Sequence, residues 1–193
     1  MGKLEKLKQL KAAYLQLMFP QVGESVPRVR FAGFEGEWVD RKLGEVAIIT
    51  MGQSPDSINY TNNPKDHILV QGNADMKNGR VIPRVWTTQV TKIADKGDLI
   101  MSVRAPVGDI GKTDYDIVLG RGVAGIKGNE FIYQTLVKMN DFGYWNGIIQ
   151  GSTFESINSS DLKNAIISIP TLPEQTAIGS FFRTLDKLIE LHK

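Results

Sequence analysis

The sequence predicts a mixed α+β fold, with a central domain of mixed sheets flanked by an amphipathic, coiled-coil-forming helix at each end. Residues 3–18 contain no glycine, proline or β-branched residue, which favours a helix. Residues 173–193 form a second helix-like run after two prolines. Between them, short apolar runs alternate with segments rich in Gly, Asn, Asp and Pro, as in domains built from short strands.

The N-terminal run, KLEKLKQLKAAYLQLM, carries a heptad pattern interrupted by Lys11. Pro20 ends the run, because proline disfavours helical backbone in the residue before it. Leu10 and Leu17 widen the apolar stripe. The residues that we expect on the stripe are Leu4, Leu7, Tyr14 and Met18.

The middle of the chain reads as a series of short elements without an internal repeat of fixed period. A turn-rich segment leads to a short strand or helical turn at 43–50 and then to a Gly-Gln-Ser-Pro loop. We expect strands at 67–71, 80–86, 98–103, 116–119 and 122–126, helices at 130–141 and 159–164, and a final buried strand at 165–170.

The C-terminal run begins at Pro173, which fits the first turn of a helix, with Glu174 placed favourably for the helix dipole. Its expected apolar face comprises Ile178, Phe181, Leu185, Leu188 and Leu191, and Phe182 and Ile189 broaden it. A helix of this length must bury such a face. Each helix packs on its own domain, or it pairs with the other helix or with a helix of a partner, an alternative that the heptad spacing at both ends raises.

Composition excludes several classes of site. The chain has 193 residues, 41% of them hydrophobic and 23% charged, which is typical of a folded domain. It has no cysteine, so disulfides, thiolate nucleophiles and cysteine-bound metals are excluded. Its two histidines, His67 and His192, make a multi-histidine metal site unexpected. We therefore expect no metal and no cofactor, no membrane span, and a cytoplasmic location.

None of the common catalytic motifs is found. The sequence has no G-x-G-x-x-G, Walker A, G-x-S-x-G or H-E-x-x-H motif and no N/D-P-P-F/Y tetrad. Fragments at 54–56 and 64–66 resemble parts of a nuclease motif, but their order is wrong and both are typical of turns. We expect no catalytic residue and predict that the chain is not an enzyme.

Positive and negative charges nearly cancel over the whole chain, but basic residues outnumber acidic ones in its middle. The net charge of +2 is too small to predict a nucleic-acid binder by itself. Residues 77–127 hold nine basic and five acidic side chains, a local excess of four positive charges. This segment is the first place to look for a contact with an anionic partner.

Several motifs, in a fixed order, resemble those of one family, the target recognition domain of the specificity subunit of Type I restriction–modification systems. The motifs are Leu43-Gly44-Glu45-Val46, Gly52-Gln53-Ser54-Pro55, Val70-Gln71-Gly72-Asn73, Ile82-Pro83, the run KGDLIMSVRAPVG at 96–108, Gly151-Ser152-Thr153-Phe154, and Ile169-Pro170-Thr171-Leu172-Pro173-Glu174-Gln175. The resemblance divides the chain into the end of a spacer helix at 1–19, a recognition domain at 20–172 and the start of the next spacer helix at 173–193.

The resemblance implies a non-catalytic subunit that reads double-stranded DNA. Members of the family usually carry two recognition domains, each reading one half of a bipartite site, with a helical coiled coil setting the gap. Modification subunits, which methylate adenine with S-adenosylmethionine, and restriction subunits assemble on them. This chain has one recognition domain, so it corresponds to a half-subunit or a fragment.

The sequence leaves open two modes of assembly and one alternative function. The terminal helices of two chains either join end to end into one helix of about 38 residues or lie against each other in a symmetric homodimer. A symmetric pair would read an interrupted palindrome. The alternative function, from another class, is a scaffold protein that docks partners through its helices and does not read DNA.

The residues that we expect to contact DNA are of two kinds. Amides, hydroxyls and guanidinium groups read base edges, whereas cations bind phosphates. Arg104 follows an apolar strand, so a buried ion pair is an equally good interpretation there. The base-contact candidates are Gln53, Ser54, Gln71, Asn73, Arg84, Arg104, Gln150, Ser152 and Thr153, and the phosphate-contact candidates are Lys77, Arg80, Lys112 and Arg121.

Overall fold

The computed structural model describes residues 2–149 and 155–193 and divides the chain into two compact units. The helical unit comprises Met1–Lys42, Asn129–Lys138 and Ile166–Lys193, and the sheet unit comprises Leu43–Gly128 and Met139–Ala165. The architecture is α+β with mixed sheets, as the sequence predicts.

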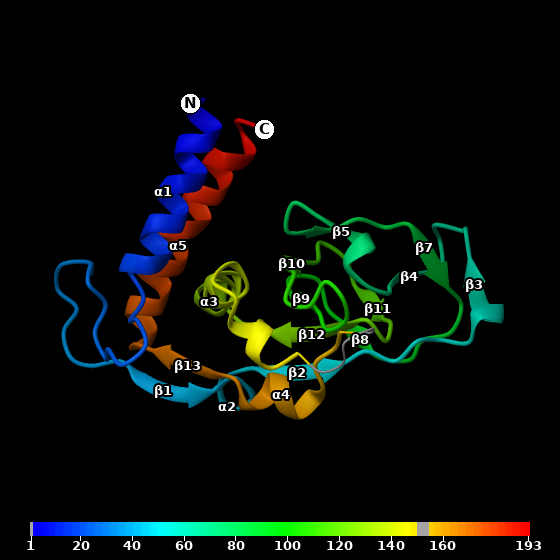
Figure 1. Cartoon of the computed structure of the whole chain (residues 1–193). Helices are drawn as coiled ribbons and strands as arrows, with labels where there is room; N and C mark the ends of the chain where they lie inside the picture. Colours follow the sequence, from blue (N-terminus) through cyan, green and yellow to red (C-terminus); the bar gives the residue numbers. More distant parts are fainter. Residues whose placement is uncertain (1, 150–154) are drawn as a thin grey trace. The chain divides into compact units, whose positions relative to one another are not determined.

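The helical unit is built from segments that are distant in the sequence. Its elements are α1 (Lys3–Leu17), β1 (Val39–Lys42), most of α3 (Glu130–Asp141), β13 (Ile166–Ile169) and α5 (Leu172–Glu190). Figure 1 shows α1 and α5 side by side and antiparallel, with both chain termini at the same end of the pair. The two terminal helices therefore pair with each other within one chain.

The helix pair is held by aromatic and polar contacts. The rings of Tyr14 and Phe181 meet edge to face, with centroids 5.1 Å apart. Lys11, which interrupts the heptad pattern, places Nζ 2.6 Å from Asp186 Oδ1. Gln134 Nε2 on α3 donates to the other oxygen of Asp186, at 2.7 Å. A polar group at a seam position restricts the register of paired helices, which explains the lysine in the stripe.

The expected stripes are covered at most positions: Leu4, Leu7 and Tyr14 are half-buried and Met18 is buried, and Ile178 and Leu185 are buried on α5. On α1 the fully buried residue is Leu15, which the predicted stripe omits, whereas Leu10 is 45% exposed. On α5 the buried residues include Phe182 and Ile189, whereas Leu188 and Leu191 are 41% and 79% exposed. α5 also packs against α3, as Gly179 beside Glu130 shows, so it contacts two helices of its own chain.

An aromatic cluster forms the core below the helix pair. The ring of Phe19 lies 5.4 Å from that of Phe131 and 5.9 Å from those of Trp38 and Phe182, measured between centroids. All four side chains are buried. These residues come from four separate segments, so their contacts hold the helical unit together.

A buried ion pair ties the loop after α1 to the start of α5. Arg30 donates from Nε and Nη2 to the two oxygens of Glu174, at 2.7 and 2.8 Å. The same guanidinium donates to the carbonyl oxygens of Glu35 and Gly36. The hydrogen bonds with Glu174 raise the pKa of Arg30. Glu174, predicted only as a helix-start residue, thus also anchors the loop.

The sheet unit contains two mixed sheets. Their strands are β2 (Ile48–Met51), β3 (Tyr60–Thr61), β4 (His67–Val70), β5 (Met76–Lys77), β6 (Arg80–Val81), β7 (Val85–Thr87), β8 (Ile93–Ala94), β9 (Leu99–Ser102), β10 (Ile110–Lys112), β11 (Ile117–Leu119) and β12 (Val123–Lys127). One sheet has the order β2-β12-β9-β10-β6-β5 and the other β3-β7-β4-β11-β8. The pairs β10–β6 and β11–β4 are parallel, and the remaining pairs are antiparallel.

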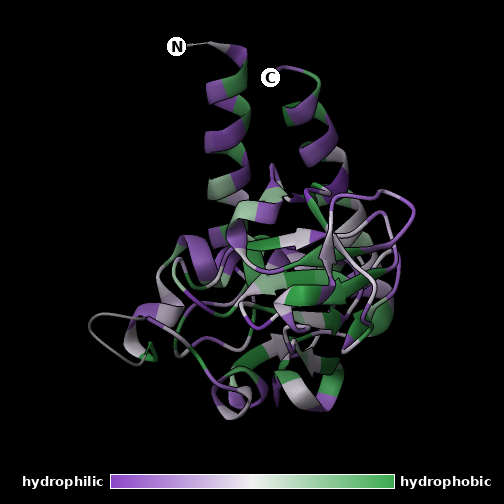
Figure 2. Cartoon of the chain, turned by 90° about the vertical axis from the view of Figure 1, so that its right-hand side faces the viewer, coloured by the Kyte–Doolittle hydropathy of each residue, from purple (hydrophilic) through white to green (hydrophobic). Residues whose placement is uncertain are grey.

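Residues from both sheets form one apolar core. Val70 and Leu119 of one sheet pack in the same buried cluster as Ile100 and Val123 of the other. Figure 2 shows green stretches among the strands in the middle of the picture, whereas many of the connecting loops are purple or white. The unit also contains α2 (Leu43–Val46), α4 (Ser159–Asn164) and the 3₁₀ turns η1 (Ser57–Asn59), η2 (Asn73–Asp75) and η3 (Tyr144–Gly147).

Helices were predicted more accurately than strands. The predicted helices at 130–141 and 159–164 are α3 and α4 within these bounds. The predicted strand at 80–86 is two strands in different sheets, separated at Pro83, which has no backbone N–H to donate. The strand β13 was predicted to be buried, but of its four residues only Ile167 is, because among the described strands it pairs with the exposed strand β1 alone.

Candidate nucleic-acid interface

A pocket of about 350 Å³ lies in the sheet unit, where loops at the ends of four strands meet. These loops follow β2, β4, β9 and β11. The lining residues are Ser54, Gln71, Gly72, Asn73, Ser102, Arg104, Ala105, Arg121 and Gly122. Five of them are predicted DNA contacts, which come together although they are spread over about 70 residues of sequence.

Glycines let the loop backbones pack directly against one another. A Cβ on Gly122 would lie 2.1 Å from the carbonyl oxygen of Gln71, and a Cβ on Gly52 would lie 1.9 Å from that of Gly120. Both distances are far below van der Waals contact, so no side chain fits at either position. The loops that carry the polar side chains are thereby held close together.

Backbone hydrogen bonds fix the same loops to the core strands. Gly120 N donates to Val70 O at 2.7 Å, and Val103 N donates to Gly122 O at 2.9 Å. Arg121 N donates to the hydroxyl of Ser54 at 3.1 Å. The turn between β11 and β12 is thus bonded to the segments that end β2, β4 and β9. The side chain of Arg121 therefore projects from a firmly held backbone.

Asp75 organises the loop after β4. The residue is 6% exposed, and its carboxylate accepts a 2.7 Å hydrogen bond from Gln71 N. Arg84 lies 3.6 Å from the other carboxylate oxygen and donates to Ala74 O at 2.7 Å. Arg84, a predicted base contact, therefore stabilises this loop and does not line the pocket. The sequence gives no signal that distinguishes Asp75 from an ordinary turn aspartate.

Two guanidinium groups line the pocket without an ion-pair partner among the described residues. Arg104 and Arg121 are both exposed. A buried ion pair was an alternative for Arg104, and its exposure contradicts that interpretation. Ser102 Oγ donates to Arg104 O at 2.7 Å and helps to hold that backbone. Neither cation is paired within the described part of the chain, so both can bind an acceptor that enters the pocket.

Three further predicted cations form a row across one end of the six-stranded sheet. Lys77 on β5 is the register partner of Arg80 on β6, and Arg80 is the partner of Lys112 on β10. Residues paired in this way share a sheet face, so the three side chains are neighbours. Asp114 lies 3.0 Å from Arg80, with both side chains about half exposed. We call Lys77, Arg80 and Lys112 the basic row.

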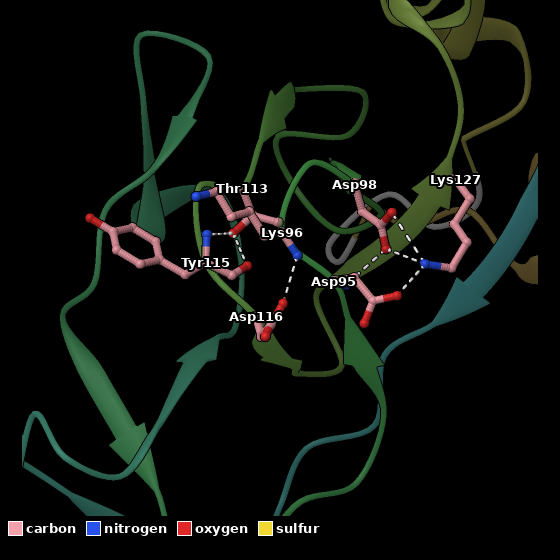
Figure 3. A network of polar contacts seen from close by, with 7 residues as sticks. All are labelled: Asp95, Lys96, Asp98, Thr113, Tyr115, Asp116 and Lys127. Carbon is pink, nitrogen blue, oxygen red and sulfur yellow. Dashed lines mark hydrogen bonds and ion pairs between the residues drawn. The ribbon is translucent and has the colours of Figure 1, made fainter.

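Not every basic residue in the middle of the chain is available to a partner. Figure 3 shows Lys127 pointing at two carboxylates, with Nζ 2.5 Å from Asp95 and 3.0 Å from Asp98. Hydrogen bonds to these carboxylates raise the pKa of Lys127. In the same network, Lys96 N donates to Asp116 at 2.8 Å. The basic side chains that could meet an anionic partner therefore lie elsewhere in the sheet unit.

The remaining predicted contacts lie outside the pocket or outside the described residues. Gln53 is exposed next to Ser54 but does not line the pocket. Gln150, Ser152 and Thr153 lie outside the described residues. Within the described part of the chain, no cluster of three acidic or histidine side chains is arranged to hold a metal. No helix there is long and apolar enough to cross a membrane.

The fold and motifs define a class, and comparison with known proteins identifies it. The chain belongs to the Type I restriction modification DNA specificity domain family, whose profile matches residues 35–193. It is 30% identical over 204 residues to the type I restriction enzyme MjaX specificity subunit of Methanocaldococcus jannaschii, with 99% of this chain covered. The chain spans 47% of that relative's length.

Solved structures agree with this assignment. The HsdS subunit from Thermoanaerobacter tengcongensis superposes with a TM-score of 0.77 at 27% identity, covering 97% of this chain and 45% of that one. A structure describing complex assembly and conformational transition of the type I R-M system gives a TM-score of 0.81 at 28% identity, covering 98% and 46%. The chain thus corresponds to about half of each.

Proposed function

We propose that this chain is the sequence-reading component of a Type I restriction–modification complex and reads one half of a bipartite DNA site. The observation that carries the proposal is the pocket, in which Arg104 and Arg121 lie beside the amides of Gln71 and Asn73. Guanidinium and amide groups are the side chains best suited to reading base edges. In this proposal residues 20–172 form the recognition domain, and 1–19 and 173–193 belong to spacer helices.

The basic row supplies the second requirement of a DNA reader. Lys77, Arg80 and Lys112 are placed to bind phosphates, which contribute affinity and orientation but little sequence information. Each phosphate contact adds about one unit to the dependence of log affinity on log salt. A row of three cations gives modest affinity, so we expect stable binding only in the assembled complex.

The chain performs no chemistry itself in this proposal. A modification subunit methylates adenine in the site that the chain selects, and a restriction subunit joins the complex for cleavage. Family membership, together with the likeness to a structure that describes assembly of the type I R-M system, supports these partners.

Two copies of the chain pair through their terminal helices to supply two half-sites. Leu10, Leu188 and Leu191 are exposed on the α1–α5 pair, as apolar positions that a second helix pair would cover. Such a homodimer has isologous contacts and reads a palindrome interrupted by a fixed gap. Light-scattering mass at micromolar concentration tests the pairing, and a mass of one chain contradicts it.

Methylation mapping tests the whole proposal. The chain is co-expressed with its modification subunit, and adenine methylation is mapped across the host genome. An interrupted palindrome with a fixed gap supports a paired reader and gives its target. An intact complex that methylates no defined motif contradicts DNA recognition and leaves a helix-docking scaffold as the better interpretation.

A further inference from the structure

We propose that Arg121 is a specificity-determining residue that recognises guanine, and not one of the phosphate contacts. This inference rests on the proposed DNA-reading function and assigns a base to one position of the pocket. A phosphate contact needs only a positive charge within reach, whereas a base contact needs a guanidinium held in one place. The backbone that carries Arg121 is held in one place, and the side chain lines the pocket.

The backbone of Arg121 is fixed on both sides. Gly122 packs so closely on the carbonyl oxygen of Gln71 that a Cβ would lie 2.1 Å away, and a Cβ on Gly120 would lie 3.0 Å from Gln71 Cα. The N–H of Arg121 itself is bonded to the hydroxyl of Ser54. Both strands that flank this turn are buried, except for Lys127 at the far end of β12.

The lining of the pocket fits a base edge better than a phosphate. The side-chain amides of Gln71 and Asn73 both donate and accept hydrogen bonds, and a phosphate diester, which has no proton to donate, uses only their donors. In the major groove, guanine presents two acceptors, O6 and N7, and the paired cytosine presents an amino donor beside them. A guanidinium next to an amide therefore complements a G·C pair.

The charges nearby leave Arg121 free for this contact. Among the described residues Arg121 has no ion-pair partner and is exposed. Lys127, on the strand that follows it, is held by Asp95 and Asp98. The basic row supplies phosphate contacts from other strands, so a phosphate role for Arg121 is not needed for affinity.

The test compares Arg121 variants with a matched cation outside the pocket. Complexes of the modification subunit with the wild-type chain, Arg121→Lys, Arg121→Ala or Lys77→Ala are assayed for methyl transfer on duplexes that differ from the target at one base pair. Arg121→Lys keeps the charge and removes the two-pronged contact, and it preserves an exposed aliphatic stem, so it is the variant least prone to misfolding. Circular dichroism and co-purification check folding and assembly.

We expect the wild-type target to contain a G·C pair at which both Arg121 variants lose discrimination by about 5- to 140-fold, with the other positions unchanged. Lys77→Ala is expected to slow transfer on all duplexes alike, because a phosphate contact carries no sequence information. A half-site without a G·C pair overturns the inference, as does unchanged discrimination in the Arg121→Lys complex. Those results leave the proposed function intact, whereas a wild-type complex without any sequence preference overturns both.

Discussion

The buried ion pair between Arg30 and Glu174 allows a quantitative test of how the helical unit is held together. We consider the substitution Arg30→Met, which keeps an unbranched apolar side chain and removes the charge. Glu174 is 1% exposed and Arg30 is 15% exposed, so the variant leaves a carboxylate buried without its counter-charge. Breaking a buried pair in this way costs about 3–5 kcal/mol. The variant also removes the hydrogen bonds to the carbonyl oxygens of Glu35 and Gly36.

The matched control is Arg28→Met in the same loop. Arg28 pairs with Glu24 at 2.8 Å, but its side chain is 61% exposed. Exposed pairs contribute little because water and side-chain entropy offset the attraction. Both variants are unfolded in urea at neutral pH and followed by far-UV circular dichroism. We expect Arg30→Met to lower the free energy of unfolding by about 3 kcal/mol or more and Arg28→Met to change it only slightly.

A double variant separates the unpaired charge from loss of packing. Arg30→Met combined with Glu174→Leu replaces the ion pair by apolar groups, which is often neutral or better. We expect it to regain most of the stability lost in Arg30→Met, because no buried charge is left without a partner. If Arg30→Met is no less stable than Arg28→Met, or if the double variant is the least stable of all, the ion pair does not hold the loop as argued.

Three further predictions concern the pocket, the helix pair and the surface network. Gly122→Ala forces a Cβ against backbone, so we expect a loss of about 1–3 kcal/mol and loss of sequence preference in methylation, with Gly147→Ala, which has open space, as the control. Lys11→Leu leaves Asp186 without its cation, and we expect about 1–2 kcal/mol of destabilisation in urea that a second change of Asp186 to Leu reverses. Because the pKa of Lys127 is raised above 10.5, its stabilisation is complete below that pH and is lost as the pH rises through the folded value. Thermal melts at increasing pH should therefore bring wild type and Lys127→Met together, and a constant difference contradicts this.

Local sequence patterns predicted the helices accurately and were enough to recognise the family motifs. The helices α3 and α4 have their predicted bounds, because capping residues and apolar spacing act within a few residues of one another. Asn158 and Asp161, for example, form a reciprocal capping box at the start of α4. The strands were harder, since β6 and β7 belong to different sheets and only the pairing partner decides that.

The sequence by itself determined the fold class, the two terminal helices, the motifs that place the chain in its family and most of the polar residues around the pocket. Only the tertiary structure decided which of those residues share a site. It brought Ser54, Gln71 and Arg121 together, assigned Arg84 to Asp75 and engaged Lys127 with two aspartates. The physical reason is that helix propensity and turn chemistry depend on near neighbours in the chain, whereas the availability of a charged side chain depends on residues brought beside it by strand pairing and loop packing.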